Sequence, residues 1–498
     1  MSKKKRILSA IALGMVCVIL TVSVVLLLQY DDPLRIAARN SDTITIVATY
    51  DRESRTLTAN QVVEYRNRST HEKNTIKFHI FANAFREGAL FPPVSDGEIA
   101  TAFPDGRSFG HINVTRVAVS GAQSIPNIIG DDANVLAVML PQPLLPNQTT
   151  RIEIDYVVQL ANIAHRLGYT DRVVNLGNFY PVPVIFDEGT WMTNTYSYNG
   201  DPFFNALHNF NVTLTKPSKY IMASSGVVIR EQTTDTTRTT TVRSYAIRDW
   251  AASLSPHFET LTRIVDRVAV NYYFLDDVDP LRSLETSIRS LRTFSRLFVR
   301  YPYKQLSVVQ TDFLHGGMEF GEIVFISTQI TEREEIDRVI IHEIAHQWWY
   351  GIIGNDQVRT AWIDEGLAEF STLLFYDENP DFGINRTDYI NTFRNNFATF
   401  ARLVHGVGGT LNTNMNRELH AFSNQYEYVF MTYVRGMLLF VDLEKVIGHN
   451  AMRASLRHLA QEHKFGILTP DCVVRGFEQT TDLRLSLFFH SFTNGLTN

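Results

Sequence analysis

The sequence predicts an α+β protein of more than one domain, with an all-β N-terminal part and a mainly helical C-terminal part. Between residues 42 and 261, short runs such as 43–47 and 151–156 alternate apolar and polar side chains, which is the period of half-buried strands. Over 262–498, apolar residues recur at helical spacing instead. A chain of 498 residues, 45% of them hydrophobic, is long enough for two or three domains with substantial cores.

Within this plan, a hairpin and a first helix can be placed. The Thr-rich stretch 233–241 predicts a polar hairpin at the edge of a sheet. Ile288, Leu291 and Phe298 recur at helical spacing. Pro302 follows, and a proline soon after such a run indicates the end of the helix.

Further elements are expected after this helix. Residues 306–313 predict a strand, and 331–350 and 362–376 predict helices. Thr331 and Glu334 have the spacing of a capping box, which predicts the start of the first of these two helices.

Composition excludes several classes of function. The chain has 46 Lys and Arg against 52 Asp and Glu, so its net charge is −6 and we expect no nucleic-acid partner. Its two cysteines, Cys17 and Cys472, are far apart in sequence. They exclude both a disulfide framework and a cysteine-based zinc site.

The N-terminus predicts a membrane anchor. Basic residues 3–6 precede 22 uncharged residues, 7–28, which as a helix would measure roughly 33 Å and span a bilayer. The positive-inside rule puts the tail 1–6 in the cytoplasm and everything beyond a juxtamembrane linker at 29–41 on the extracytoplasmic side. A cleaved signal peptide is the alternative, but its apolar run is shorter and no small-x-small cleavage site follows here. We therefore expect a single-pass cell-membrane protein.

The second half carries a metal-binding pattern. His342 and His346 flank Glu343 in an H-E-x-x-H sequence, and residues four apart on a helix share a face, so both imidazoles can bind one ion. Glu365, nineteen residues after His346, can supply the third protein ligand of a catalytic zinc site. A surface helix that merely bears histidines is the alternative. The pattern predicts one Zn²⁺ per chain, with Glu343 as the general base because zinc already has three protein ligands.

Further segments extend this pattern in both directions. HEIAHQWW starts at His342, and W-x-x-E-G spans residues 362–366. Upstream lies LHGGMEF at 314–320, and downstream YVRG begins at Tyr433. Together, in this order, they resemble the gluzincin aminopeptidase family typified by aminopeptidase N, with DWA at 249–251 marking the domain junction. The resemblance implies a saddle-like β domain packed on a thermolysin-like catalytic domain.

The resemblance also implies roles for residues beside the metal. Tyr433 matches the family tyrosine that stabilises the oxyanion, and Tyr426 and Tyr428 are its nearby rivals. Glu369 lies one helical turn after Glu365. It either accepts a hydrogen bond from a ligand histidine or is a solvated helix residue.

Substrate binding is implied by the segment upstream of the metal pattern. Glu319 matches the family glutamate that holds the free α-amine of the substrate. Gly316, Gly317 and Met318 precede it, and in the family the backbone of this segment lies along the peptide like an added strand. The alternative is that Glu319 merely ends a strand near the surface.

Three departures from the family pattern bear on the site. Phe320 and Asp364 both stand where the family has asparagine. The sequence continues for only 65 residues after Tyr433, so we expect no C-terminal helical domain folded over the active site.

The function expected is a zinc metallopeptidase, an aminopeptidase whose partners are peptides with a free N-terminus and the membrane that holds residues 7–28. A thermolysin-like endopeptidase is the alternative that uses the same residues. A non-catalytic receptor or scaffold ectodomain is disfavoured, since all the metal ligands and the base are present. A lipid-epoxide hydrolase, which the family also contains, stays open on these motifs.

Overall fold

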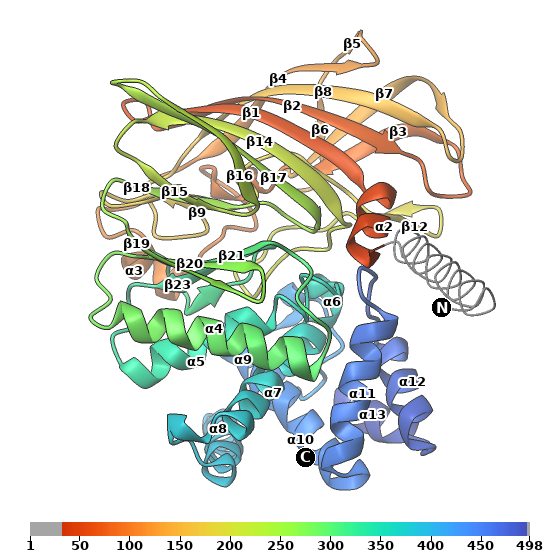
Figure 1. Ribbon diagram of the computed structural model, residues 1–498. Coiled ribbons are helices and arrows are strands. Elements are labelled where there is room, and N and C mark those ends of the chain that lie inside the picture. Colours follow the sequence, from red (N-terminus) through yellow and green to blue (C-terminus); the bar gives the residue numbers. More distant parts are fainter. Residues whose placement is uncertain (1–31, 496–498) are drawn as a thin grey trace, which may run out of the picture.

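The computed structural model describes residues 32–495 and confirms the α+β prediction (Figure 1). The β-sheets form the upper half in that view, and most helices form the lower half. Helix α2 (Pro33–Asn40) occupies most of the predicted linker, and the Asp32 side chain caps its first turn. The predicted anchor, 7–28, lies outside the described residues. Within 32–495, no helix has both the length and the apolar composition needed to cross a bilayer.

An eight-stranded sheet dominates the first half. Its strands in spatial order are β16 (Val227–Thr233), β17 (Thr237–Ile247), β14 (His208–Pro217), β1 (Asp42–Asp51), β2 (Thr56–Arg66), β8 (Thr149–Gln159), β4 (His111–Val119) and β5 (Ala122–Ser124). β1 and β14 are parallel, while the other neighbours are antiparallel. Along β1, Ile44, Ile46 and Ala48 are buried and their neighbours are not, as the alternating pattern predicts. β16 and β17 form the predicted Thr-rich hairpin, with β16 at the edge.

Three smaller sheets complete the first half. One contains β15 (Ile221–Ser224), β18 (Ala252–Ser255), β10 (Val174–Leu176) and β9 (Leu167–Tyr169). Another contains β11 (Val182–Pro183), β3 (Lys73–His79), β7 (Val135–Leu144) and β6 (Asn127–Ile129), and β12 (Phe186–Asp187) pairs with β13 (Thr190–Trp191). The connections hold the short helices η1 (Phe81–Phe85), η2 (Asp96–Glu98) and α3 (Ile99–Ala102).

A five-stranded sheet opens the second half. Its order is β19 (Glu259–Val265), β20 (Val268–Phe274), β21 (Gln305–Thr311), β23 (Ile323–Ser327) and β22 (Gly317–Met318). The boundary predicted at 261/262 therefore falls inside its first strand. Helix α4 (Pro280–Leu297) connects the parallel strands β20 and β21. Asp279 caps this helix and Pro280 occupies its first turn, which suits a residue without a backbone N–H.

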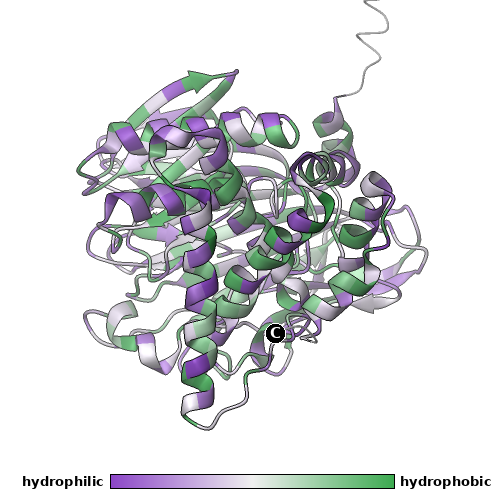
Figure 2. Cartoon of the chain, turned by 90° about the horizontal axis from the view of Figure 1, so that it is seen from below, coloured by the Kyte–Doolittle hydropathy of each residue, from purple (hydrophilic) through white to green (hydrophobic). Residues whose placement is uncertain are grey.

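The remaining helices surround the metal pattern. They are α5 (Arg333–Ala345), α6 (Gln357–Thr360), α7 (Trp362–Glu378), η3 (Pro380–Phe382), α8 (Arg386–Gly406), η4 (Leu419–Ala421), α9 (Gln425–Val429), η5 (Phe430–Val434), α10 (Arg435–Ile447), α11 (His449–Glu462), α12 (Pro470–Thr481) and α13 (Ser486–Thr493). Seen from below, hydrophilic and hydrophobic stretches alternate along these helices, as expected where one face packs on a core (Figure 2).

The capping box predicted for Thr331 and Glu334 does not form. Glu332 is the N-cap residue of α5, and no side chain caps this end. Because the helix starts one residue later than the box requires, Glu335 occupies the third helical position, where it accepts a hydrogen bond from Arg338 at 2.8 Å. The helix also ends at Ala345, short of the predicted residue 350, and a turn follows it.

Buried polar contacts join the two halves at the predicted junction. Arg248, 2% exposed, donates to the carbonyl of Asn205 in its own half at 2.9 Å. It also donates to the carbonyls of Tyr350 and Gly466 in the other half, each at 2.6 Å. Asp249 accepts from the Tyr350 hydroxyl. A buried guanidinium with three carbonyl acceptors holds both halves in one register, because separating them would leave the charge without partners.

Candidate active site

The three predicted metal ligands converge where α5 ends and α7 begins. His342 lies in the last turn of α5, and His346 is its C-cap residue, still in right-handed helical conformation (φ −63°, ψ −18°). The two rings therefore keep the i, i+4 spacing that places them on one face. Glu365 lies in the first turn of α7. All three side chains are buried.

Their donor atoms fit a zinc ion. His342 Nε2 and His346 Nε2 lie 3.0 Å apart, and Glu365 Oε2 is 3.4 Å from the first and 3.2 Å from the second. Tetrahedral ligands about 2.0–2.1 Å from zinc are roughly 3.3 Å from one another, so the three atoms have the required spacing. Two imidazoles and one carboxylate are also the donor set of catalytic zinc sites that keep one position for water or substrate.

Glu369 supports this site from behind. It is buried, and its Oε1 lies 3.3 Å from His342 Nδ1 and accepts from Arg338 at 2.9 Å. Burial opposes its ionisation, but Arg338 and His342 outweigh burial and hold the pKa of Glu369 at about 2. The ring of His346 is oriented by the Trp349 carbonyl, 3.0 Å from its Nδ1. Glu369 is therefore not a solvated helix residue, and its carboxylate lies beside the ring nitrogen of His342 that faces away from the other metal-ligand candidates.

Glu343, the predicted base, packs against the edge strand β22. Its side chain is buried, and burial raises the pKa of Glu343 to about 7. The carboxylate lies directly against Gly317, where a Cβ atom would overlap Glu343 Oε1. Around Gly316, by contrast, the nearest side-chain atom is 3.7 Å from a Cβ position. A side chain at Gly317 would therefore force the Glu343 carboxylate to move, whereas one at Gly316 would not.

Two tyrosines reach the metal ligand Glu365. Tyr433 lies in the π-helical turn η5, an irregularity that is frequent at functional sites, and its hydroxyl donates to Glu365 Oε1 at 2.5 Å. Its ring stacks on His342 with 5.6 Å between centroids. The Tyr428 hydroxyl lies 3.4 Å from the same oxygen. Tyr426 is 75% exposed and is not part of the site. The sequence treated Tyr428 as a rival of Tyr433, whereas the structure brings both hydroxyls to one carboxylate.

Glu319 lies in the interior and not at the surface. It is 3% exposed, and Gln357 donates from one amide nitrogen to Glu319 Oε1 and to Asp364 Oδ2, each at 2.7 Å. Burial, with the nearby charge of Asp201, raises the pKa of Glu319 well above its usual range. Phe320 is fully buried. The alternative in which Glu319 merely ends a surface strand is therefore wrong.

A cleft of about 710 Å³ runs past these residues and is lined by both halves. The second half contributes His342, Glu343 and Tyr433, while helix α8 adds a wall that includes Tyr389 and Phe393. The first half contributes Glu98, Arg166, Tyr198, Gly200 and Asp201. Sequence reasoning missed these five residues and Gln357. They belong to none of the motifs and are brought to the site only by folding.

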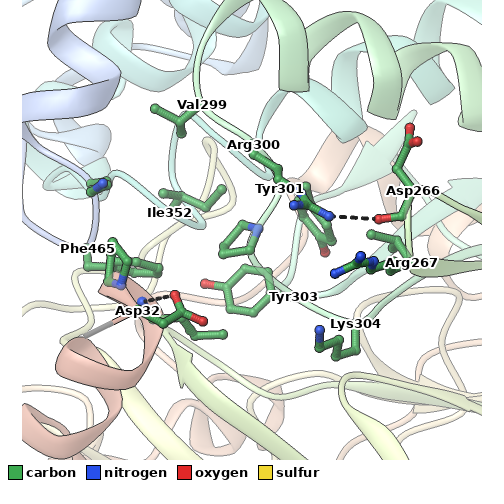
Figure 3. Close-up of a pocket in the computed structure, with 15 residues that line it drawn as sticks. Asp32, Asp266, Arg267, Val299, Arg300, Tyr301, Tyr303, Lys304, Ile352 and Phe465 are labelled. Atoms are coloured by element: carbon green, nitrogen blue, oxygen red, sulfur yellow. Dashed lines mark hydrogen bonds between the residues drawn. The ribbon is translucent and has the colours of Figure 1, made fainter. Parts of the chain in front are cut away.

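A second cavity, of about 840 Å³, lies where the described chain begins (Figure 3). Figure 3 shows Tyr303 between Asp32 and Lys304, with Arg267 and Arg300 nearby. None of its lining residues lines the cleft. This cavity is therefore separate from the site that holds the metal ligands.

An H-E-x-x-H helix beneath a five-stranded sheet, with a glutamate supplied by a following helix, defines a metal site of the zinc-metallopeptidase class. The family model for the peptidase family M1 domain matches residues 282–492. The match contains the metal ligands, Glu343 and Tyr433. It supports the resemblance to aminopeptidase N on which the site residues were predicted, and the M1 family uses one catalytic zinc.

Two relatives that match this chain are aminopeptidases. Aminopeptidase N of Lactobacillus helveticus is 24% identical over 42% of this chain and 26% of its own length. Endoplasmic reticulum aminopeptidase 2 of Homo sapiens is 23% identical over 48% of this chain and 27% of its own length. The chain thus spans about a quarter of the length of these curated relatives.

Among solved structures, an M1 zinc metallopeptidase from Deinococcus radiodurans has a TM-score of 0.63 and 15% identity, covering 92% of this chain and 94% of that one. A mutant of that enzyme was solved bound to a Tyr-Ser-Ala substrate. At this identity the likeness shows the shared fold.

The contact between Gly317 and Glu343 generates a prediction with an internal control. In Gly317→Ala the new methyl group displaces the Glu343 carboxylate, and we expect peptidase turnover to fall about 100-fold or more, the usual worth of a general base. Gly316→Ala adds the same methyl group where space exists and should keep turnover within about threefold. Steady-state kinetics and thermal unfolding of both variants check this. Equal losses in the two variants would contradict the assigned contact.

Proposed function

We propose that this chain is a zinc metallopeptidase that removes the N-terminal residue of peptides with a free α-amine. The observation that carries the proposal is the distance from Glu319 to the metal ligands, since one of its carboxylate oxygens lies within 4.8 Å of a ring nitrogen of His346. In a peptide, about 2.5 Å separates the α-nitrogen from its own carbonyl carbon. An ammonium bound to Glu319 would therefore place the first peptide bond, and no later one, beside the metal ligands.

The charge of the site supports this binding mode. Glu319 has a single hydrogen-bond donor, Gln357, and no Lys or Arg of residues 32–495 lies within 4.0 Å of it. Because burial raises the pKa of its carboxyl, an incoming ammonium would supply the positive charge that the site lacks. Such a charge-assisted hydrogen bond is worth about 1.5–3 kcal/mol.

Hydrolysis follows from the positions of two further side chains. Zinc, when held by His342, His346 and Glu365, would supply a Lewis acid that polarises the scissile carbonyl and lowers the pKa of water. Glu343 accepts a proton from the attacking water as its oxygen bonds to the carbonyl carbon. It then delivers that proton to the leaving nitrogen as the C–N bond breaks. The Tyr433 hydroxyl, next to the ligand atoms, donates to the carbonyl oxygen as negative charge develops there.

Two substitutions distinguish the role of the base from that of the metal ligands. Glu343→Gln is nearly isosteric but cannot accept a proton, so we expect it to retain one equivalent of zinc and to lose about 10²- to 10⁴-fold in turnover. His346→Ala removes a ligand and should lose both zinc and activity. Metal analysis and kinetics on the purified proteins check both results. The base would be misassigned if Glu343→Gln kept more than about a tenth of wild-type turnover.

Dependence on the free amine tests the exopeptidase assignment. We expect a peptide with a free N-terminus to be cleaved about 10- to 150-fold better, by kcat/KM, than its N-acetylated twin, and chelator to abolish both reactions. Glu319→Ala should reduce this preference toward unity. Equal cleavage of both peptides by the wild type would favour the thermolysin-like endopeptidase instead.

We also propose that residues 7–28 anchor the protein in the cell membrane with the catalytic half outside. The uncharged segment behind a basic cluster supports this.

Fractionation tests the anchor. The full chain should stay in the membrane fraction through alkaline carbonate washing, and protease added to intact cells should cleave the catalytic half. Mature protein starting near residue 30 and recovered from the medium would instead show a cleaved signal peptide.

A further inference from the structure

A second carboxylate in the cleft has no role in the proposed chemistry. Glu98, at the end of η2 in the first half, lines the cleft with 22% of its side chain exposed. Its Oε2 accepts from the Ser95 hydroxyl at 2.6 Å. No Lys or Arg in residues 32–495 comes within 4.0 Å of it. The other first-half acid in the cleft, Asp201, is by contrast neutralised by Arg166.

The groups around Glu98 leave it available to a ligand. His315 Nδ1 lies 3.8 Å from Glu98 Oε1. Burial lowers the pKa of His315, so its ring is neutral and does not balance the carboxylate charge. The amide of Gln425 satisfies all its neighbours when its nitrogen faces Glu98, 2.6 Å from Oε1, and its oxygen accepts from His315 Nδ1 at 3.1 Å. Within residues 32–495, the groups that hold Glu98 are thus neutral donors.

This carboxylate lies at the amine end of the cleft. Glu319, the proposed amine anchor, is next to His346, whereas Tyr389 of α8 is next to Glu369, the partner of His342. The leaving part of a substrate would therefore extend toward α8. Glu98 lies on the other side of the cleft, because the Gln425 amide that faces it is one turn before Tyr428 in α9, and the Tyr428 hydroxyl lies directly against Gly200, the neighbour of Asp201.

We propose that Glu98, framed by His315 and Gln425, binds the positively charged side chain of a lysine or arginine at the first position of the substrate. This inference rests on the proposed aminopeptidase function and names its substrate class. The first residue of such a substrate carries two positive charges, and each of them binds a carboxylate that has no Lys or Arg partner within residues 32–495. Glu319 binds the α-ammonium, and Glu98 binds the side-chain cation.

The test compares lysine with norleucine, which has a similar side chain without the charge. Aminoacyl chromogenic amides of both residues are assayed with the wild-type full chain. We expect kcat/KM to favour lysine by about 10- to 150-fold, the usual worth of a charge-assisted hydrogen bond. The preference should shrink as ionic strength rises, because the site is partly open to solvent. A wild-type enzyme that cleaves both amides equally well, or prefers norleucine, would overturn the proposal.

Glu98→Gln identifies the residue responsible. We expect the lysine-to-norleucine ratio to fall to within about threefold of unity, while thermal unfolding checks that the variant stays folded. Asp96→Asn is the matched control, since this neighbouring carboxylate is fully solvent-exposed, and it should leave the ratio unchanged. A ratio unaffected by Glu98→Gln would overturn the role of Glu98. Retained discrimination against N-acetylated substrate in that variant would show that the aminopeptidase function itself still holds.

Discussion

Burial of ionisable side chains between α5 and α7 is the constraint on which the site depends. His342, Glu343 and Glu365 are each at most 5% exposed, and charges that are removed from water without partners cost several kcal/mol each. Glu369 and Arg338 continue the chain of opposite charges behind His342. A divalent cation at the three ligand atoms would complete this balance. The buried arrangement between these helices is therefore stable only when each charged side chain keeps its oppositely charged partner.

Close packing of two helices makes that arrangement possible. A Cβ atom on Gly366 of α7 or on Gly436 of α10 would lie 2.9 Å from the backbone of the other glycine. Glu365 precedes the first glycine and Tyr433 lies one turn before the second, so the approach of the backbones brings carboxylate and hydroxyl within 2.5 Å. The π-helical turn η5 contributes to this placement of Tyr433, because an extra residue in a helical turn rotates the side chains that precede it relative to those that follow.

The two halves divide the work of the cleft. Every residue proposed to take part in bond breaking belongs to the second half, which the M1 family model matches. The first half contributes Arg166, Asp201 and Glu98 to the cleft, and in the proposed binding mode they set the charge around the substrate's first residue. Arg248 holds the halves in register, so the charges that select a substrate keep a constant position relative to the catalytic groups.

The sequence by itself predicted the α+β plan, which the structure confirms, and the three zinc-ligand candidates, which the structure brings together. Local patterns suffice there: strands repeat every two residues, and His342 and His346 share a helical face whatever the rest of the chain does. It could not decide between alternatives that depend on burial, such as the role of Glu369, or the exposure of Tyr426 against that of Tyr428. Nor could it identify Glu98, which carries no motif. Only the tertiary structure brings this residue to a site more than two hundred residues away, because charge complementarity across a cleft depends on distances in space and not along the chain.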